Sequence, residues 1–221
     1  MAEAFRAQTA QGRRGLGADR QIIFSRIEAT DMESILLHCC CAPCSVYCVG
    51  SLRQEGMEPT AFWYNPNIHP WQEYKARRDT LTDYASSIGM DLIVREEYGL
   101  RDFVAHVAGD ISHRCAWCYA CRMEETARYA SEHGFSAFTT TLLISPYQQH
   151  ERIAAAAEEM AERYGVRFLY RDFRPGFRQG QSKARELGLY MQKYCGCVFS
   201  EEERYQKQIQ RDQARFCGGA E

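Results

Sequence analysis

Cysteines with metal-binding spacing are the most informative feature of this 221-residue sequence, which contains eleven of them. Most of them fall into three groups, which are Cys39-Cys40-Cys41 with Cys44 close behind, Cys115 with Cys118, and Cys195 with Cys197. Adjacent cysteines pair with one another only in strained geometry, whereas they can jointly face one metal centre. The grouping and the odd count therefore predict metal or redox chemistry rather than a disulfide scaffold.

The first group follows an apolar run and precedes Pro43, a residue that favours the first turn of a helix. Backbone N–H groups at a helix N-terminus stabilise thiolates and anionic clusters. We expect Cys40 and Cys41 to bind metal, with Cys44 in the first helical turn as a further candidate. Cys39 should point elsewhere, because successive side chains alternate along an extended segment.

The second group places Cys115 and Cys118 three residues apart, hence on one side of a helical turn. Cys121 continues this spacing but drifts round the helix, so we expect it to be structural. The third group has a central glycine, which permits a tight turn beside a cofactor. Six or more gathered thiols exceed the needs of a structural zinc ion and favour an iron–sulfur centre with a second metal or a redox dithiol. Structural zinc and metal-free thiol chemistry remain alternatives.

Short apolar runs alternate with longer amphipathic stretches, which is typical of a parallel sheet with helical crossovers. The strands are expected at 34–38, 59–64, 91–94, 137–144 and 166–170. We predict an α/β fold with an open, doubly wound, mostly parallel sheet of about five strands. Ligand sites in such sheets collect at the carboxyl ends of the strands. The segments expected to converge there are 39–41, 65–67, 145–147 and 172–174.

Composition limits the domain organisation and the partners. With 45% hydrophobic and 25% charged residues, we expect one α/β domain over residues 33–215. Residues 1–32 show little periodicity and 216–221 are polar and Gly-rich, so both should be flexible. The formal net charge of -2 leaves room only for a local basic face. Neither a membrane-spanning run nor a signal-peptide pattern is apparent, which predicts a cytoplasmic protein without a membrane partner.

Six motifs follow one another between about Ser34 and Ser200. They are Leu36–Ser45, Tyr64–Pro70 with Glu73, Tyr74 and Arg77, Arg114–Arg122, Phe138–Gln148, Asp172–Phe177 and Tyr190–Ser200. In these motifs the sequence resembles the cobalamin-independent epoxyqueuosine reductases of the QueH type, which act late in the synthesis of the tRNA anticodon base queuosine. The resemblance implies a Rossmann-like fold related to the nucleotide α-hydrolases.

The resemblance also implies a 4Fe-4S cluster with an additional iron ion close by. The residues that it marks as cofactor-binding are Cys40, Cys41, Cys115, Cys118, Cys195 and Cys197, with Cys44 added for the second metal. The division of these thiols between the two centres stays open. Four cysteines lie outside the family pattern, namely Cys39, Cys48, Cys121 and Cys217.

The implied reaction removes the epoxide oxygen from epoxyqueuosine in tRNA and leaves an alkene. It consumes two electrons and two protons and releases water, so an external electron donor is implied. Asp172, Tyr147 and His69 stand at predicted strand or loop ends and are the candidate catalytic proton donors. Cations that could form a basic face for tRNA phosphates are Arg77, Arg78, Arg171, Arg174, Arg178, Lys183 and Arg185, with Tyr74 beside them.

Two other functions fit part of this pattern. A zinc-stabilised RNA-binding module without catalysis would use the same thiols for structure. An ATP-using tRNA sulfur transferase of similar fold would need a Ser/Gly-rich phosphate loop after the first strand. This chain has Cys39–Cys44 at that place, so ATP use is disfavoured.

Overall fold

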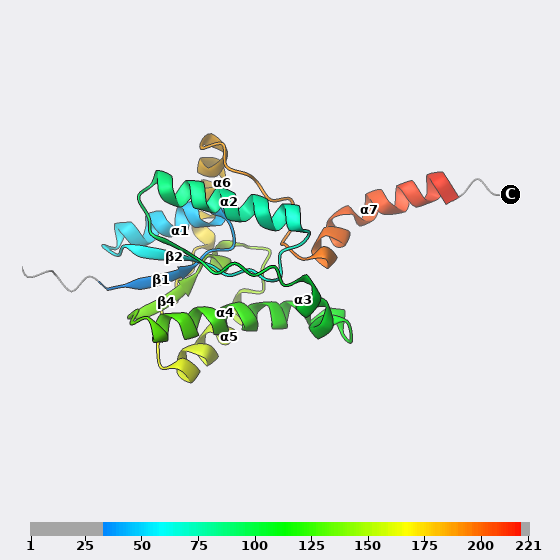
Figure 1. Ribbon diagram of the computed structural model, residues 1–221. Helices are drawn as coiled ribbons and strands as arrows, with labels where there is room; N and C mark the ends of the chain where they lie inside the picture. The colour runs from blue at the N-terminus through cyan, green and yellow to red at the C-terminus, as the bar shows by residue number, and fades with distance from the viewer. Residues whose placement is uncertain (1–32, 218–221) are drawn as a thin grey trace, which may run out of the picture. The chain divides into compact units, whose positions relative to one another are not determined.

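Five parallel strands form the central sheet of the computed structural model, which describes residues 33–217 (Figure 1). The strands are β1 (Ile35–His38), β2 (Pro59–Trp63), β3 (Leu92–Val94), β4 (Ala137–Thr140) and β5 (Arg167–Phe168). Their order is β3-β2-β1-β4-β5, so the chain winds outward from β1 in one direction and then returns to wind outward in the other. This confirms the predicted doubly wound α/β sheet. The extension expected at 1–32 lies outside the described residues, and so do residues 218–221 of the tail expected at 216–221. Residues 216 and 217 of that expected tail belong instead to the last helix.

Helices cover both faces of the sheet. They are α1 (Ala42–Gln54), α2 (Trp71–Ser87), α3 (Leu100–Val107), α4 (Arg114–Glu132), α5 (His150–Tyr164), α6 (Phe177–Glu186) and α7 (Val198–Cys217). Short 3-10 turns are η1 (Ile111–His113), η2 (Thr141–Ile144) and η3 (Arg174–Gly176). Figure 1 shows α1, α2 and α6 on one face of the sheet and α4 and α5 on the other. None of the described helices is long and apolar enough to span a membrane.

The central strands read as apolar runs because both of their faces are covered. Ile35, Leu36 and Leu37 on β1 are all fully buried, and Phe138 on β4 is buried beside them. The core therefore lies along β1 and β4, and the loops that follow these two strands leave the sheet side by side.

The fourth strand is shorter than its sequence suggests. Its apolar, β-branched residues predict a strand over 137–144, but β4 ends at Thr140 and continues as the 3-10 turn η2. The Thr140 hydroxyl accepts a hydrogen bond from the Leu142 N–H at 3.1 Å, so a side chain takes over a backbone donor that would continue the ladder. The resulting turn brings the Thr141 hydroxyl to the backbone N–H of Cys40 at 3.1 Å.

The contact between α1 and η3 depends on a glycine. A Cβ atom added at Gly176 would lie 2.0 Å from Cζ of Tyr47, a residue of α1. We expect Gly176→Ala to lower the free energy of unfolding by about 1–3 kcal/mol, because the half-buried Tyr47 ring must move. The control is Gly50→Ala on α1, the helix that carries Tyr47, since nothing lies within 4 Å of a Cβ added there. It should raise stability by roughly 0.5–1 kcal/mol. Equal urea midpoints for the two variants would contradict this packing.

Candidate metal centre

Three thiols of the first group converge at the carboxyl end of β1. The Sγ atoms of Cys40, Cys41 and Cys44 all lie within 4.8 Å of one another, and the Cys40 and Cys41 sulfurs are 3.8 Å apart. Metal–sulfur bonds of about 2.3 Å in tetrahedral geometry separate two thiolates by roughly 3.8 Å. The three thiols are therefore spaced to hold a single metal ion, and within the described residues no other group of ligand atoms is as tight.

Cys40 is the member of this trio that is poised to be a thiolate. Hydrogen bonds from the neighbouring thiols of Cys41 and Cys44 hold the pKa of Cys40 well below its usual range, and the Thr141 hydroxyl donates to its sulfur at 3.5 Å. The hydrogen bond with Cys40, together with burial, raises the pKa of Cys44. Because the thiolate is the form that binds metal, Cys40 is the first ligand that this arrangement offers.

Three other cysteines have surroundings that fit a structural role. Cys39 donates its S–H to the Leu37 carbonyl at 3.3 Å, and burial raises its pKa to about 12. Cys48 is fully buried in the core. Cys121 lies against the Cys118 carbonyl at 3.6 Å, and burial raises its pKa to about 12 as well.

The second and third groups meet across a small cavity. Cys115, Cys118, Cys195 and Cys197 all line this cavity of about 230 Å³. They come from the start of α4 and from the loop before α7, more than 70 positions apart in the sequence. Within the described chain, no three of these four sulfurs lie within 4.8 Å of one another. The four thiols are thus spread more widely than a single ion needs.

A larger cavity of about 760 Å³ adjoins the thiols and opens at the carboxyl edge of the sheet. Its lining includes Cys40 and Cys44 of the first group and Cys195 of the third. Tyr147, Gln148 and Cys195 line both cavities, so the two spaces are neighbours. The loops after β1 and β4 therefore converge as the topology predicts.

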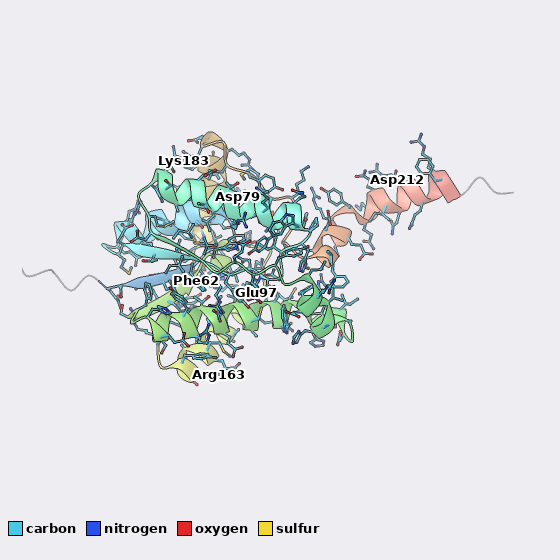
Figure 2. All side chains as sticks on the ribbon, viewed as in Figure 1. Phe62, Asp79, Glu97, Arg163, Lys183 and Asp212 are labelled. Carbon is cyan, nitrogen blue, oxygen red and sulfur yellow. The ribbon has the colours of Figure 1, made fainter. Side chains whose placement is uncertain are left out.

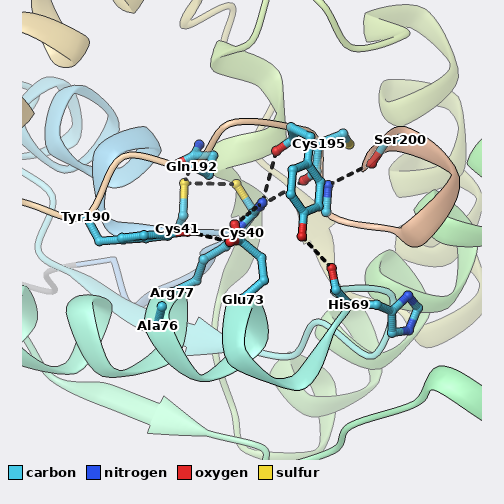
Figure 3. Close-up of polar contacts among 12 residues, drawn as sticks. Cys40, Cys41, His69, Glu73, Ala76, Arg77, Tyr190, Gln192, Cys195 and Ser200 are labelled. Carbon is cyan, nitrogen blue, oxygen red and sulfur yellow. Dashed lines mark hydrogen bonds and ion pairs between the residues drawn. The ribbon is translucent and has the colours of Figure 1, made fainter. Parts of the chain in front are cut away.

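Two glutamines hold thiols by their amide groups, a role that sequence reasoning missed. Gln192 Nε2 donates to Cys41 Sγ at 3.0 Å, as Figure 3 shows. Gln148 Nε2 donates to Cys195 Sγ at 3.2 Å, and Oε1 of the same amide accepts from the Tyr119 hydroxyl at 2.7 Å. An amide that donates to sulfur favours the thiolate form. Both glutamines stand in the sequence motifs, which was the only signal for them.

A buried guanidinium lies against the second thiol group. Arg122 Nη2 donates to Cys118 Sγ at 2.9 Å, and its Nε donates to the Cys118 carbonyl at 2.9 Å. Burial alone would lower the pKa of Arg122, but the thiols of Cys118, Cys121 and Cys195 outweigh burial and raise it. Arg122 therefore stays charged and can offset the negative charge of a metal–thiolate centre.

Arg77 has a different place from the exposed basic face expected of it. Its guanidinium is buried and donates to the carbonyls of Cys195 at 2.8 Å and Tyr194 at 2.9 Å (Figure 3). It also pairs with Glu73 at 2.6 Å, and the Tyr190 hydroxyl bonds to the same carboxylate. The physical reason is that these loop carbonyls need donors that helix α2 supplies. Arg77 thus holds the third cysteine group in place.

The three candidate proton donors lie in different settings. Tyr147 lines both cavities and is 86% exposed. The His69 ring is buried against Phe103, with ring centroids 5.0 Å apart. Asp172 is paired with Arg174 at 2.7 Å, and that hydrogen bond holds its pKa at about 2. Neither His69 nor Asp172 lines the thiol cavities, because packing and an ion pair occupy their side chains.

Most of the expected basic face is neutralised by carboxylates. The pairs are Arg78 with Asp79 and Glu96, Arg171 with Glu55, Arg174 with Asp172, and Lys183 with Glu186. Arg178 and Arg185 differ, since they line the large cavity. Two cations that the sequence did not single out, Lys193 and Arg204, line it with them. The basic character is therefore concentrated at the cavity.

These features define a Rossmann-like α/β domain with a thiol-lined candidate metal centre at the carboxyl edge of its sheet. A family model described as epoxyqueuosine reductase QueH matches residues 35–203. The chain belongs to this family.

Relatives support the same placement, and one solved structure shares the fold. A protein named epoxyqueuosine reductase QueH from Dehalococcoides mccartyi is 38% identical over 173 residues, which cover 78% of this chain and 95% of that protein. Its namesake from Thermotoga maritima is 34% identical over 195 residues, covering 83% and 98%. The U34-tRNA thiolase NcsA from Methanococcus maripaludis, solved with its 4Fe-4S cluster, superimposes with a TM-score of 0.50 at 12% identity and covers 83% of this chain and 67% of that one. This likeness shows a shared fold.

Two ion pairs on α2 with the same spacing give a matched test of the role of Arg77. Arg77→Leu should destabilise the protein by about 3–5 kcal/mol, because Glu73 and two loop carbonyls lose a buried partner. Lys75→Ala breaks the exposed pair with Asp79 and should change stability by less than about 1 kcal/mol. Urea unfolding of both variants measures the difference. Similar losses would show that burial does not distinguish the pairs.

Proposed function

We propose that this chain reduces epoxyqueuosine in tRNA to queuosine. The observation that carries the proposal is a cavity of about 760 Å³ lined by thiols from two cysteine groups, in a chain of the QueH family. This volume suits a nucleoside-sized ligand. In the proposed reaction both C–O bonds of the epoxide break, a C=C bond forms, and the oxygen leaves as water. Two protons and two electrons balance the step, and an external donor supplies the electrons.

The spacing of the thiols supports a division between two centres. A cubane cluster is held by up to four thiolates, which are Cys115, Cys118, Cys195 and Cys197 in this proposal. The tighter trio of Cys40, Cys41 and Cys44 would hold the additional iron ion. When bound, the cluster would relay single electrons and the iron would polarise the epoxide oxygen.

The surrounding side chains hold charge and orientation in this scheme. Arg122 offsets the negative charge at Cys118, and Gln192 and Gln148 orient sulfurs at Cys41 and Cys195. Each of these donors would also stabilise the negative charge that reduction adds to the centre. Removing one of them would therefore make the reduced state less favourable relative to the oxidised state.

Tyr147 serves the substrate in two ways in this proposal. Its exposed ring at the mouth of the cavity can stack on a base of the anticodon loop. Its hydroxyl is also the one candidate proton donor of the three that lines the cavity. Because tRNA is the substrate, we place the reaction in the cytoplasm.

Metal and sulfide content distinguish the proposed cluster site from the proposed site of the additional iron ion. After anaerobic reconstitution with iron and sulfide, we expect a brown protein containing both elements. Cys118→Ala should lose most of the acid-labile sulfide and the visible absorbance, whereas Cys44→Ala should keep both and lose about one iron per chain. Cys121→Ala is the control and should match the unsubstituted protein. A colourless protein with stoichiometric zinc would instead support a zinc-stabilised RNA-binding module.

The reaction itself is tested on tRNA that carries epoxyqueuosine. The reconstituted protein with a chemical reductant should convert it to queuosine, detected as the loss of one oxygen by mass spectrometry of the digested nucleosides. Cys40→Ala should lower the rate by at least about 100-fold, because the best thiolate of the iron trio is lost. If a complete cluster forms and no epoxide is consumed, the proposed reaction is wrong.

A further inference from the structure

Helix α7 is the largest element that the proposed reaction leaves without a role. It spans Val198–Cys217, whereas the family model ends at residue 203. Residues 206–216 are all exposed, and Figure 2 shows this part of α7, where Asp212 is labelled, extending away from the sheet and its covering helices. A helical stretch of this length with no covered face in the described part of the chain is unusual unless a partner covers it.

Four cations form a stripe along this helix. Arg204, Lys207, Arg211 and Arg215 are spaced by three, four and four residues, which places them within an arc of about 80° on an α-helix. Over eleven residues the stripe extends roughly 16 Å. We call these four residues the α7 stripe.

The charge of the α7 stripe is not neutralised within residues 33–217. None of its four members forms an ion pair there. Arg211 Nε donates to the Lys207 carbonyl at 3.2 Å, and the Arg215 guanidinium lies 5.1 Å from the Phe216 ring centroid. This contrasts with the cations of α2 and α6, where Lys75, Arg78 and Lys183 have carboxylate partners.

The α7 stripe is continuous with the candidate site. Arg204 lines the large cavity together with Arg178, Arg185 and Lys193. Just before it, Glu203 pairs with Arg114 at 2.5 Å and ties the first turns of α7 to the start of α4, beside Cys115. Positive charge therefore runs from the mouth of the thiol cavity outward along one side of α7.

We propose that the α7 stripe binds the phosphate backbone of the RNA that carries the substrate nucleoside. This inference rests on the proposed function, since it takes tRNA as the substrate. Regularly spaced cations that displace counterions from phosphates give affinity without reading sequence. The cavity takes the modified nucleotide, and the α7 stripe contacts backbone beyond it.

A charge-matched pair of triple variants tests this proposal in the reconstituted full chain. The stripe variant is Lys207→Gln, Arg211→Gln and Arg215→Gln. The control is Gln206→Glu, Gln210→Glu and Gln213→Glu, which lie away from the stripe and lower the formal net charge by the same amount. Arg204 is left unchanged because it lines the cavity. Circular dichroism checks that both variants keep their helix content.

Binding of tRNA is measured by fluorescence anisotropy over a range of salt concentrations. We expect the stripe variant to weaken binding about tenfold or more, and the slope of log K against log salt to become shallower by roughly 2–3. The control should stay within about threefold of the unsubstituted protein and keep its slope, because only general repulsion changes.

Steady-state kinetics provide a second readout. The stripe variant should raise KM for full-length tRNA and leave kcat unchanged, while a trinucleotide containing epoxyqueuosine should be reduced as efficiently as by the unsubstituted protein. Equal binding and equal salt slopes for the stripe variant and the control would overturn the inference. An unsubstituted protein that binds tRNA with the expected slope but consumes no epoxide would instead refute the proposed function, so the two failures are distinguishable.

Discussion

Two buried positive charges are the constraint on which the site depends. A metal centre needs thiolates, and several thiolates placed in a protein interior cost a great deal unless opposite charge lies nearby. Arg122 donates to the Cys118 sulfur, and Arg77 donates to the Cys195 carbonyl. The nearby Cys41 thiol acts on Arg77 by its charge and raises the pKa of this guanidinium. Each guanidinium must in turn be satisfied. Carbonyls of the cysteine-bearing segments, together with Glu73, accept their hydrogen bonds, so the cations and the thiols position one another.

The sheet decides where these partners can meet. Because β1 and β4 are adjacent and parallel, the loops after them leave at the same edge, and the early end of β4 brings Thr141 to Cys40. The third cysteine group reaches this edge from far along the chain, and Gly196 makes the approach possible. Its φ of 155° is one that other residues rarely adopt, and an added Cβ would make a tight contact with Ile68 at 3.2 Å and lie 3.6 Å from the Arg77 guanidinium.

The order of strands and helices and the grouping of the thiols could be predicted from the sequence, because periodicity and spacing are local properties. The surroundings of single side chains could not. Glu73 with Arg77 and Lys75 with Asp79 show the same spacing on α2, yet one pair is buried and the other exposed. The difference comes from the backbone carbonyls of Tyr194 and Cys195, which accept hydrogen bonds from Arg77. These residues are 117 and 118 positions away from Arg77 in the sequence. Asp172 is the opposite case, since its partner Arg174 is only two residues away and was a readable signal.

The fate of the cations also bears on how the chain would treat its substrate. The cations of a surface that binds RNA cannot be paired with carboxylates of the same chain, because such an ion pair competes with binding to the phosphates. Most cations near β5 are paired in this way, which removes them from recognition. Several cations without a carboxylate partner in residues 33–217 line the large cavity instead, namely Arg178 and Arg185 on α6, Lys193 in the following loop and Arg204 near the start of α7. A nearly neutral chain can thus present a strongly basic surface at the one place where a nucleic acid has to enter, so net charge alone is a poor guide to its partner.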